Sequence, residues 1–416
     1  MTGLPFCLAC SEFMKDLALN ASQLAELAAR NRALAAKRHA PRRSERIRDA
    51  LLRRIAKAPT WQARRADPNT FLLIRPDHIG DAVLSMPAIR ALRAAQPQAR
   101  LIVLCGAWSA EVFAAYPEVD QVVTLPFPGF GRSRRRGALW RPYWQAWRAA
   151  RQVRHIEAGI ALILRPDHWW GALLAKWAGI PKRVGYDLPN VAPFLTHTVP
   201  YREAHCALEN AALIAEWTGG QVPQDLSAPF PFTEEDTAYV RSLLGEDAKR
   251  YAVIHVGAGS AYKTWTAENW AYVADQLVEK LGVAIALTGS EREHAAAAAI
   301  SAHIRRTAAY SLLGETNLSQ LAALYAGAVV VLGADTGPLH IAVSVGAPSV
   351  HLFGPSDPMR FGPWGNSARH AVLAAEIACR PCRILDWAGD DAANHPCLSL
   401  IRREAVLSAA LRVARR

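Results

Sequence analysis

The sequence of 416 residues has no long apolar run and no segment resembling a secretion signal. No uninterrupted apolar stretch approaches the roughly 18 residues of a membrane-spanning helix, which excludes an integral helical membrane protein. Near the start, Glu12, Lys15 and Asp16 interrupt any apolar segment, so we expect no signal peptide and a cytoplasmic protein. In that compartment the seven cysteines should be reduced or metal-bound and not paired in disulfides.

The chain also has fewer acidic than basic residues. The chain has 36 Asp and Glu against 48 Lys and Arg, a formal net charge of +12. The excess lies in two blocks: residues 30–65 hold 13 basic and two acidic residues, and residues 132–154 hold eight arginines and no acid. Such clustering indicates an anionic partner for those two blocks, on a body that is otherwise near neutral.

Residues 1–69 are predicted to form a basic helical extension. Ala- and Leu-rich helical patterns alternate there with arginines and are interrupted by prolines. Ile47, Leu51 and Ile55 recur at a spacing of four, which places one apolar stripe on a helix whose other faces carry Arg.

From residue 70 onward, short apolar runs alternate with helical patterns, which predicts an α/β fold with parallel sheets. The alternation occurs twice, so we expect two doubly wound, Rossmann-like domains facing a cleft. Their predicted bounds are 70–218 and 233–416, joined by a Pro-, Gly- and Ser-rich linker at 219–232. The predicted strands are Phe71–Arg75, Arg100–Cys105, Gln121–Leu125, Gly159–Leu164 and Arg183–Tyr186, then Tyr251–Val256, Val283–Leu287, Ala309–Leu313, Val329–Leu332 and Ser349–Phe353.

Asp81 follows the first of these strands, where a helix is expected to begin at or just after it. Ligands of open α/β sheets bind beyond the carboxyl ends of the strands. The carboxylate of Asp81 is therefore either a helix N-cap or a general base that faces the cleft.

Two segments of the second domain could bind an anion. The turn Val256–Ser260 offers backbone N–H groups, and Lys263 adds a charge; the alternative is a tight turn with a surface lysine. Asp335, Thr336 and Gly337 follow a strand and open a helix, with His340 one turn further on. They could hold one anion at that helix N-terminus, or simply cap the helix above a core-packed His340.

These segments together resemble glycosyltransferase family 9, the bacterial heptosyltransferases of lipopolysaccharide core assembly. The resemblance covers about residues 70–400, in the family's order. It rests on Ile79-Gly-Asp81, Leu84-Ser-Met-Pro-Ala-Ile-Arg-Ala-Leu92, His205-Cys-Ala-Leu-Glu-Asn210, Gly257–Ser260 with Lys263 and Trp265, Thr288-Gly-Ser-Glu291, Ala334-Asp-Thr-Gly-Pro-Leu-His340 and Leu352-Phe-Gly-Pro-Ser356. Asp77 and His78 depart from the family, which often has small or hydroxyl residues there, and this indicates a different acceptor.

The resemblance implies a GT-B fold and an inverting, cofactor-free transfer of heptose from an ADP-sugar to a lipopolysaccharide core or related acceptor. Carried over by position, Asp81 would be the general base, and the helix N-terminus and a lysine would stabilise the leaving diphosphate. The implied donor-binding residues are Ser260, Lys263, Glu291, Asp335, Thr336, Gly337 and His340. Alternatives are a different nucleotide sugar, a protein (autotransporter) acceptor, or a non-catalytic nucleotide-sugar-binding protein. Asp81 argues against the last, because a pure binder has no need of a carboxylate opposite the donor.

Cys379, Cys382 and Cys397 resemble a metal knuckle, and one autotransporter-modifying branch of the family holds iron at such a cluster. A tetrahedral site needs a fourth ligand. The sequence therefore allows either a structural iron or zinc site completed by another group, or free thiols in a loop.

The arginine block 132–154 interleaves basic and aromatic residues, without any nucleic-acid-binding motif. In an acceptor domain it suits a phosphorylated saccharide–lipid at the inner face of the cytoplasmic membrane, with the protein bound peripherally. Arg134, Arg135 and Arg136 are the predicted acceptor-binding residues. The alternative is a solvated helix whose aromatic side chains face the core.

Overall fold

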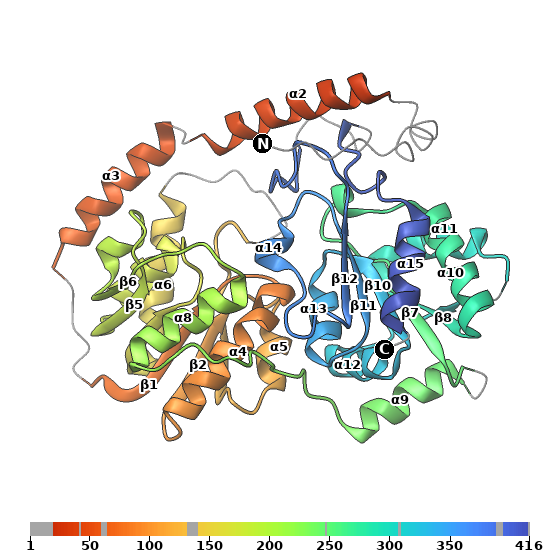
Figure 1. The fold of residues 1–416 in the computed structure, drawn as a ribbon. Coiled ribbons are helices and arrows are strands. Elements are labelled where there is room, and N and C mark those ends of the chain that lie inside the picture. Colours follow the sequence, from red (N-terminus) through yellow and green to blue (C-terminus); the bar gives the residue numbers. More distant parts are fainter. Residues whose placement is uncertain are drawn as a thin grey trace.

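The structure is a computed structural model (Figure 1). It describes residues 20–40, 43–59, 65–130, 140–245, 248–306, 309–387 and 394–414. Among the helices within these ranges, none combines the length and the apolar character needed to cross a membrane.

The first sheet has six parallel strands in the order β3-β2-β1-β4-β5-β6. The central strand β1 is completely buried from Thr70 to Arg75, because helices cover both of its faces. α4, α5 and α8 pack on one face, and α6 and α7 on the other. The bounds are β1 (Asp67–Arg75), β2 (Arg100–Cys105), β3 (Gln121–Thr124), β4 (Ala158–Ile163), β5 (Lys182–Tyr186), β6 (His197–Val199), α4 (Ile79–Ala95), α5 (Ala110–Ala115), α6 (Arg141–Val153), α7 (Trp169–Trp177) and α8 (Cys206–Thr218).

The second sheet repeats this topology. Its order, β12-β11-β10-β7-β8-β9, equals that of the first sheet when the strands are counted from β7, and all pairs are parallel. α9, α12 and α13 lie on one face, and α10, α11 and α15 on the other. The bounds are β7 (Tyr251–His255), β8 (Ala284–Thr288), β9 (Tyr310–Ser311), β10 (Val330–Ala334), β11 (Ser349–Phe353), β12 (His370–Ala374), α9 (Glu234–Leu244), α10 (Ala267–Leu281), α11 (His294–His303), α12 (Leu318–Gly327), α13 (Gly337–Ser344), α14 (Pro358–Phe361) and α15 (Arg403–Ala414).

The predicted fold class is therefore confirmed: an α/β protein with two Rossmann-like sheets. We call the part built on β1–β6 the N-terminal lobe and the part built on β7–β12 the C-terminal lobe. Among the strands, β6 and β12 had no counterpart in the sequence prediction, because each lies at the edge of its sheet and is only partly buried.

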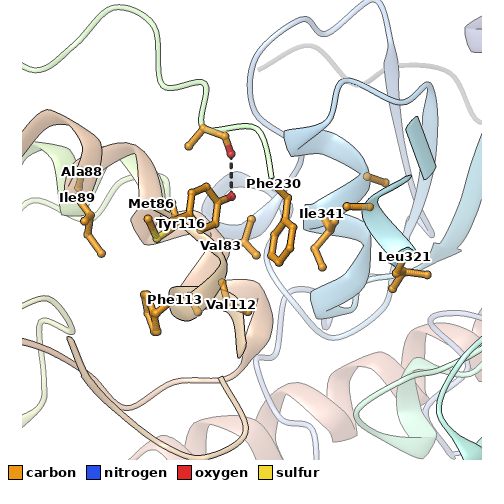
Figure 2. Packing of buried hydrophobic residues seen from close by; sticks show 14 of the residues in the cluster. Val83, Met86, Ala88, Ile89, Val112, Phe113, Tyr116, Phe230, Leu321 and Ile341 are labelled. Carbon is orange, nitrogen blue, oxygen red and sulfur yellow. Dashed lines mark hydrogen bonds between the residues drawn. The ribbon is translucent and has the colours of Figure 1, made fainter. Parts of the chain in front are cut away.

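An apolar interface joins the two lobes (Figure 2). Val83 of α4 lies on one side of Phe230, and Ile341 of α13 lies on the other. The rings of Phe230 and Tyr116 meet edge to face at 5.5 Å, and the Tyr116 hydroxyl donates to the Ala228 carbonyl at 2.9 Å. Part of the segment predicted as a linker is thus buried in the contact between the lobes.

The N-terminal extension forms two helices, α2 (Ala21–His39) and α3 (Arg43–Lys57), and touches both lobes (Figure 1). α2 lies on the C-terminal lobe, where the Asn31 amide donates to the Asn394 carbonyl at 2.8 Å. α3 packs on the N-terminal lobe through Leu52, which is 1% exposed. The predicted apolar stripe is only partly used for packing, since Ile47 is 70% and Leu51 44% exposed.

Candidate functional site

The centres of the two sheets face each other through α4 and α13. α4 follows β1 and α13 follows β10, and both strands lie where the winding of their sheet reverses, which is where α/β proteins bind ligands. The first turns of these helices are in backbone contact. A methyl group on Gly80 would lie 2.8 Å from Cδ2 of His340, and one on Gly337 would lie 2.9 Å from the backbone nitrogen of Gly80. Glycine at both positions allows this approach.

Asp81 is the third residue of α4, and the N-cap position belongs to His78. The expected helix start at or after Asp81 is therefore wrong, and with it the N-cap interpretation. The side chain of Asp81 is 31% exposed and accepts a hydrogen bond from Nη2 of Arg75 at 3.2 Å. Burial, and next the nearby Asp77 carboxylate, raise the pKa of Asp81 to about 6, although Arg75 opposes the shift.

Asp77 lies in a buried ion cluster beneath Asp81. Its carboxylate contacts Arg165, and its Oδ2 is 3.1 Å from Nε of Arg75 without hydrogen-bond geometry. Burial would raise the pKa of Asp77, but Arg75 and Arg165 outweigh it and hold the pKa below its usual value. Asp77 is therefore an ionised structural partner of the two arginines. Sequence reasoning missed both arginines, although each directly follows or ends a predicted strand.

Arg75 also connects the cluster to the rest of the N-terminal lobe. Its Nη1 donates to the Leu164 carbonyl at 3.0 Å and to Oδ1 of Asn210 at 3.3 Å. These bonds hold the guanidinium in place, so the carboxylate of Asp81 receives a fixed partner.

Lys263 and Asp335, both predicted to bind a donor, are paired with each other. Nζ of Lys263 is 2.5 Å from Oδ2 of Asp335 and donates to its carbonyl oxygen at 3.2 Å. The two side chains are only 12% and 8% exposed. Burial would raise the pKa of Asp335, but Lys263 lowers it overall, so the carboxylate stays ionised. A bound phosphate would have to share Lys263 with this carboxylate.

His340 lies at the contact between the lobes. Its ring stacks on Trp364 with centroids 5.9 Å apart, and burial lowers its pKa to about 4, so the imidazole is neutral at pH 7. Its Nδ1 is buried, with no hydrogen-bond partner in the described part of the chain. Thr336 occupies the N-cap position of α13 without a side-chain cap. The N–H of Leu339 donates to the Thr336 carbonyl at 3.2 Å and is therefore not open to an anion.

Ser260 lies in the same loop as Lys263, whose backbone N–H donates to the Ser260 carbonyl at 3.0 Å. The hydroxyl of Ser260 donates to the Leu385 carbonyl at 2.6 Å and accepts from the Tyr262 N–H at 3.2 Å. Ser260 thus stabilises the conformation of the loop, through a contact that could not be predicted from the sequence. Glu291 is exposed in the turn after β8, against Gly314, at the same sheet edge as the loop that carries Lys263.

A second contact between the lobes involves the 203–210 segment. His205 hydrogen-bonds to the Gly362 carbonyl at 3.0 Å through Nε2, and Nη2 of Arg360 is 2.9 Å from Oε1 of Glu209, which is almost fully buried. Glu203 pairs with Arg383 at 2.7 Å. In the sequence, this segment was noted only as one of the motifs of the family resemblance.

The three predicted acceptor arginines, Arg134, Arg135 and Arg136, lie outside the described residues.

The cysteines of the predicted metal knuckle share one small cavity of about 10 Å³. In the absence of a metal, burial raises the pKa of Cys379 and Cys382, and that of Cys397 to about 12, so the three thiols are protonated. Within the described ranges no three His, Cys, Asp or Glu side chains are arranged to hold a metal ion. These residues therefore give the predicted iron or zinc no support.

Comparison with known proteins gives the family. The model of glycosyltransferase family 9 (heptosyltransferase) matches residues 146–385, more than half of the chain. The chain belongs to glycosyltransferase family 9. This confirms the resemblance seen in the sequence and makes the protein a glycosyltransferase.

Two relatives show how similar individual proteins are to this chain. Lipopolysaccharide heptosyltransferase 2 of Escherichia coli K12 is 28% identical over 314 residues, which cover 72% of this chain and 86% of the relative. Lipopolysaccharide heptosyltransferase 1 of Pseudomonas aeruginosa is 26% identical, covering 75% and 85%.

Solved structures agree in fold. A family 9 glycosyltransferase from Veillonella parvula superposes with a TM-score of 0.67 at 22% identity, covering 85% of this chain and 99% of that one. The E. coli ADP-heptose lps heptosyltransferase II gives a TM-score of 0.65 at 23% identity, covering 83% and 98%.

The contact between α4 and α13 predicts the effect of a single methyl group. Gly337→Ala should lower the free energy of unfolding by about 1–3 kcal/mol, because the backbone at Gly80 cannot yield as a flexible side chain would. Alanine otherwise favours a helix over glycine, so a loss would come from the contact itself. Denaturant unfolding measures it. Gly220→Ala, where a methyl meets only the Thr218 hydroxyl at 3.3 Å, is the control. Equal stability of Gly337→Ala and the wild type would contradict the close approach.

Proposed function

We propose that this glycosyltransferase transfers a heptose from ADP-heptose to a lipopolysaccharide core or related cell-envelope saccharide, with inversion at the anomeric carbon. The observation that carries the proposal is the position of Asp81. This carboxylate, with its pKa raised to about 6, lies in the first turn of α4, directly beside the turn of α13 that follows Asp335. The sugar and the acceptor class are taken from the relatives, which are lipopolysaccharide heptosyltransferases, one of them an ADP-heptose enzyme.

Asp81 would act as the general base. A base is most effective when its pKa lies near the working pH, and a pKa near 6 leaves most of this carboxylate ionised at pH 7. It would take the proton of the acceptor hydroxyl while that oxygen attacks the anomeric carbon. The ADP then departs from the opposite face, so the configuration inverts in one displacement without a covalent intermediate.

The C-terminal lobe would stabilise the leaving group. Charge develops on the diphosphate as its bond to the sugar breaks, and Lys263 with the N-terminus of α13 offers positive potential there. Asp335 holds Lys263 at 2.5 Å and so positions the ammonium group. Glu291, exposed at the same sheet edge, would bind the ribose. Ser260 is a weaker candidate, because its hydroxyl is already bonded.

In this proposal each lobe binds one of the two substrates. Residues 70–218 would bind the acceptor and residues 233–416 the nucleotide sugar, with 219–232 between them. The reaction would take place where the first turns of α4 and α13 meet.

Replacing the base separates chemistry from binding. Asp81→Asn should lower the transfer rate by about 10²–10⁴-fold, because the amide cannot accept the proton. The affinity for the ADP-sugar should change little, since Asp81 faces the acceptor. ADP release and donor titration measure the two quantities, and Asp225→Asn on the linker is the matched control. Undiminished transfer by Asp81→Asn would rule out the general-base role.

The donor can be identified by thermal unfolding with ADP-, UDP-, GDP- and dTDP-sugars. A bound ligand at about 100 times its dissociation constant stabilises the folded state by about 2.7 kcal/mol, so the preferred donor should raise the melting temperature most. We expect ADP-heptose to give the largest shift. A clear preference for a sugar donor with another nucleotide would overturn the ADP-heptose assignment. The fold and the role of Asp81 would not be affected.

A further inference from the structure

Helix α6 presents tryptophan to solvent and alanine to the core. Trp140, just before the helix, and Trp144 and Trp147 within it are 64%, 48% and 49% exposed. Their spacing of four and three places them on one side of the helix. The buried positions are Ala146, Ala149, Ala150 and Val153. The alternative that the aromatic residues face the core is therefore wrong for all three tryptophans.

Arginines alternate with these tryptophans on the same side. The guanidinium carbon of Arg148 lies 5.5 Å from the ring centre of Trp144, and that of Arg151 lies 5.0 Å from that of Trp147. The helix carries no acidic residue. The result is a surface of indole rings and positive charge, which we call the Trp–Arg face.

Helix α3 of the extension is connected to α6 through Trp169, and it carries exposed aliphatic side chains. The guanidinium of Arg48 lies over the ring of Trp169 at 5.9 Å, and that ring packs against Tyr143 of α6 at 5.8 Å. Ile47, the neighbour of Arg48, is 70% exposed, and Leu51, one turn on, is 44% exposed. Further exposed basic residues of α3 are Arg43, Arg46, Arg53, Arg54 and Lys57.

We infer that the Trp–Arg face of α6, together with Ile47 and Leu51 of α3, binds the surface of an anionic lipid bilayer. Tryptophan favours the interface between lipid and water, where its ring is buried and its N–H stays hydrated. Arginines near such a surface are attracted by anionic headgroups. Exposed aliphatic side chains gain from the acyl region and gain nothing from a nucleic-acid backbone. A second copy of the same face would be repelled by its charge.

The position of this face suits an enzyme that acts on a lipid-borne saccharide. At the start of α6, the Pro142 carbonyl accepts a hydrogen bond from the Trp170 indole at 2.8 Å. Trp170 follows the loop after β4, whose Arg165 contacts Asp77 below Asp81. The start of α6 is thus connected, through Trp170 and the loop after β4, to the acceptor side of the site. This reason for the face rests on the proposed function, but the binding itself does not.

Co-sedimentation of the full-length protein with vesicles tests the inference, using phosphatidylcholine alone and with about 30% phosphatidylglycerol. The wild type should bind the anionic vesicles, and more weakly at high salt. Two double variants remove one contribution each: Trp144→Ser/Trp147→Ser and Arg148→Gln/Arg151→Gln. Each should bind the anionic vesicles at least about tenfold more weakly than the wild type, since both contributions are needed. Phe232→Ser, an exposed aromatic on the linker, and Arg241→Gln on α9 are the matched controls and should bind as the wild type does.

Three outcomes would overturn the inference. The first is that the wild type fails to bind anionic vesicles, and the second is that the tryptophan variant binds them as well as the wild type does. The third is that the variants keep vesicle binding but lose binding to an oligonucleotide. Thermal unfolding of each variant shows whether the fold is intact, and the exposed positions make unfolding a poor explanation. No sugar is present, so failed vesicle binding says nothing against transfer. Failed transfer with intact vesicle binding would count against the proposed function alone.

Discussion

The site depends on one contact, the backbone approach of α4 and α13 at Gly80 and Gly337. Two similar Rossmann-like sheets could meet in many ways, but the missing side chains at these glycines let the first turn of each helix touch the other. The apolar interface around Phe230 and the ion pair between Glu209 and Arg360 hold the same arrangement from two other sides. Everything proposed for Asp81 follows from its place beside this contact.

Burial and pairing give the carboxylates around the contact different charge states. Asp77 meets two guanidinium groups and keeps a low pKa, and Asp335 meets Lys263 with the same result. Asp81 lies 3.2 Å from Arg75, but its burial and then the repulsion of Asp77 outweigh this attraction and raise its pKa. One carboxylate is thus able to exchange a proton near neutral pH while its neighbours serve as fixed charges. This is the distribution that a general base requires.

Sequence patterns predicted the sheets well because buried parallel strands are continuous apolar runs. The segment Arg100–Cys105 matches β2, and Ser349–Phe353 matches β11. Short edge elements such as β6 and β9 lack that signal, so the first was missed and the second is shorter than expected. The start of α4 was misplaced, because His78 and not Asp81 occupies the N-cap position.

The hydrogen-bond and ion-pair partners of individual side chains could not be predicted from the sequence. Asp335 and Lys263 were both predicted at the site, but their separation of 72 residues gave no sign that they pair with each other. The hydroxyl of Ser260 meets the Leu385 carbonyl, a contact between loops far apart in the chain. Likewise, the helical period of α3 revealed its apolar residues but not that Leu52, outside the predicted stripe, would be the buried one.

The pH dependence of transfer is the most direct test of the central claim that Asp81, with its raised pKa, is the base. The rate at subsaturating substrate should rise about tenfold per pH unit below pH 6, where the carboxyl is protonated, and level off above it, because a base acts only when ionised. The low-pH limb should disappear from the residual activity of Asp81→Asn, while circular dichroism shows that both proteins stay folded over the same pH range. A profile that is flat from pH 5 to 8, or one that keeps this limb in Asp81→Asn, would contradict the account.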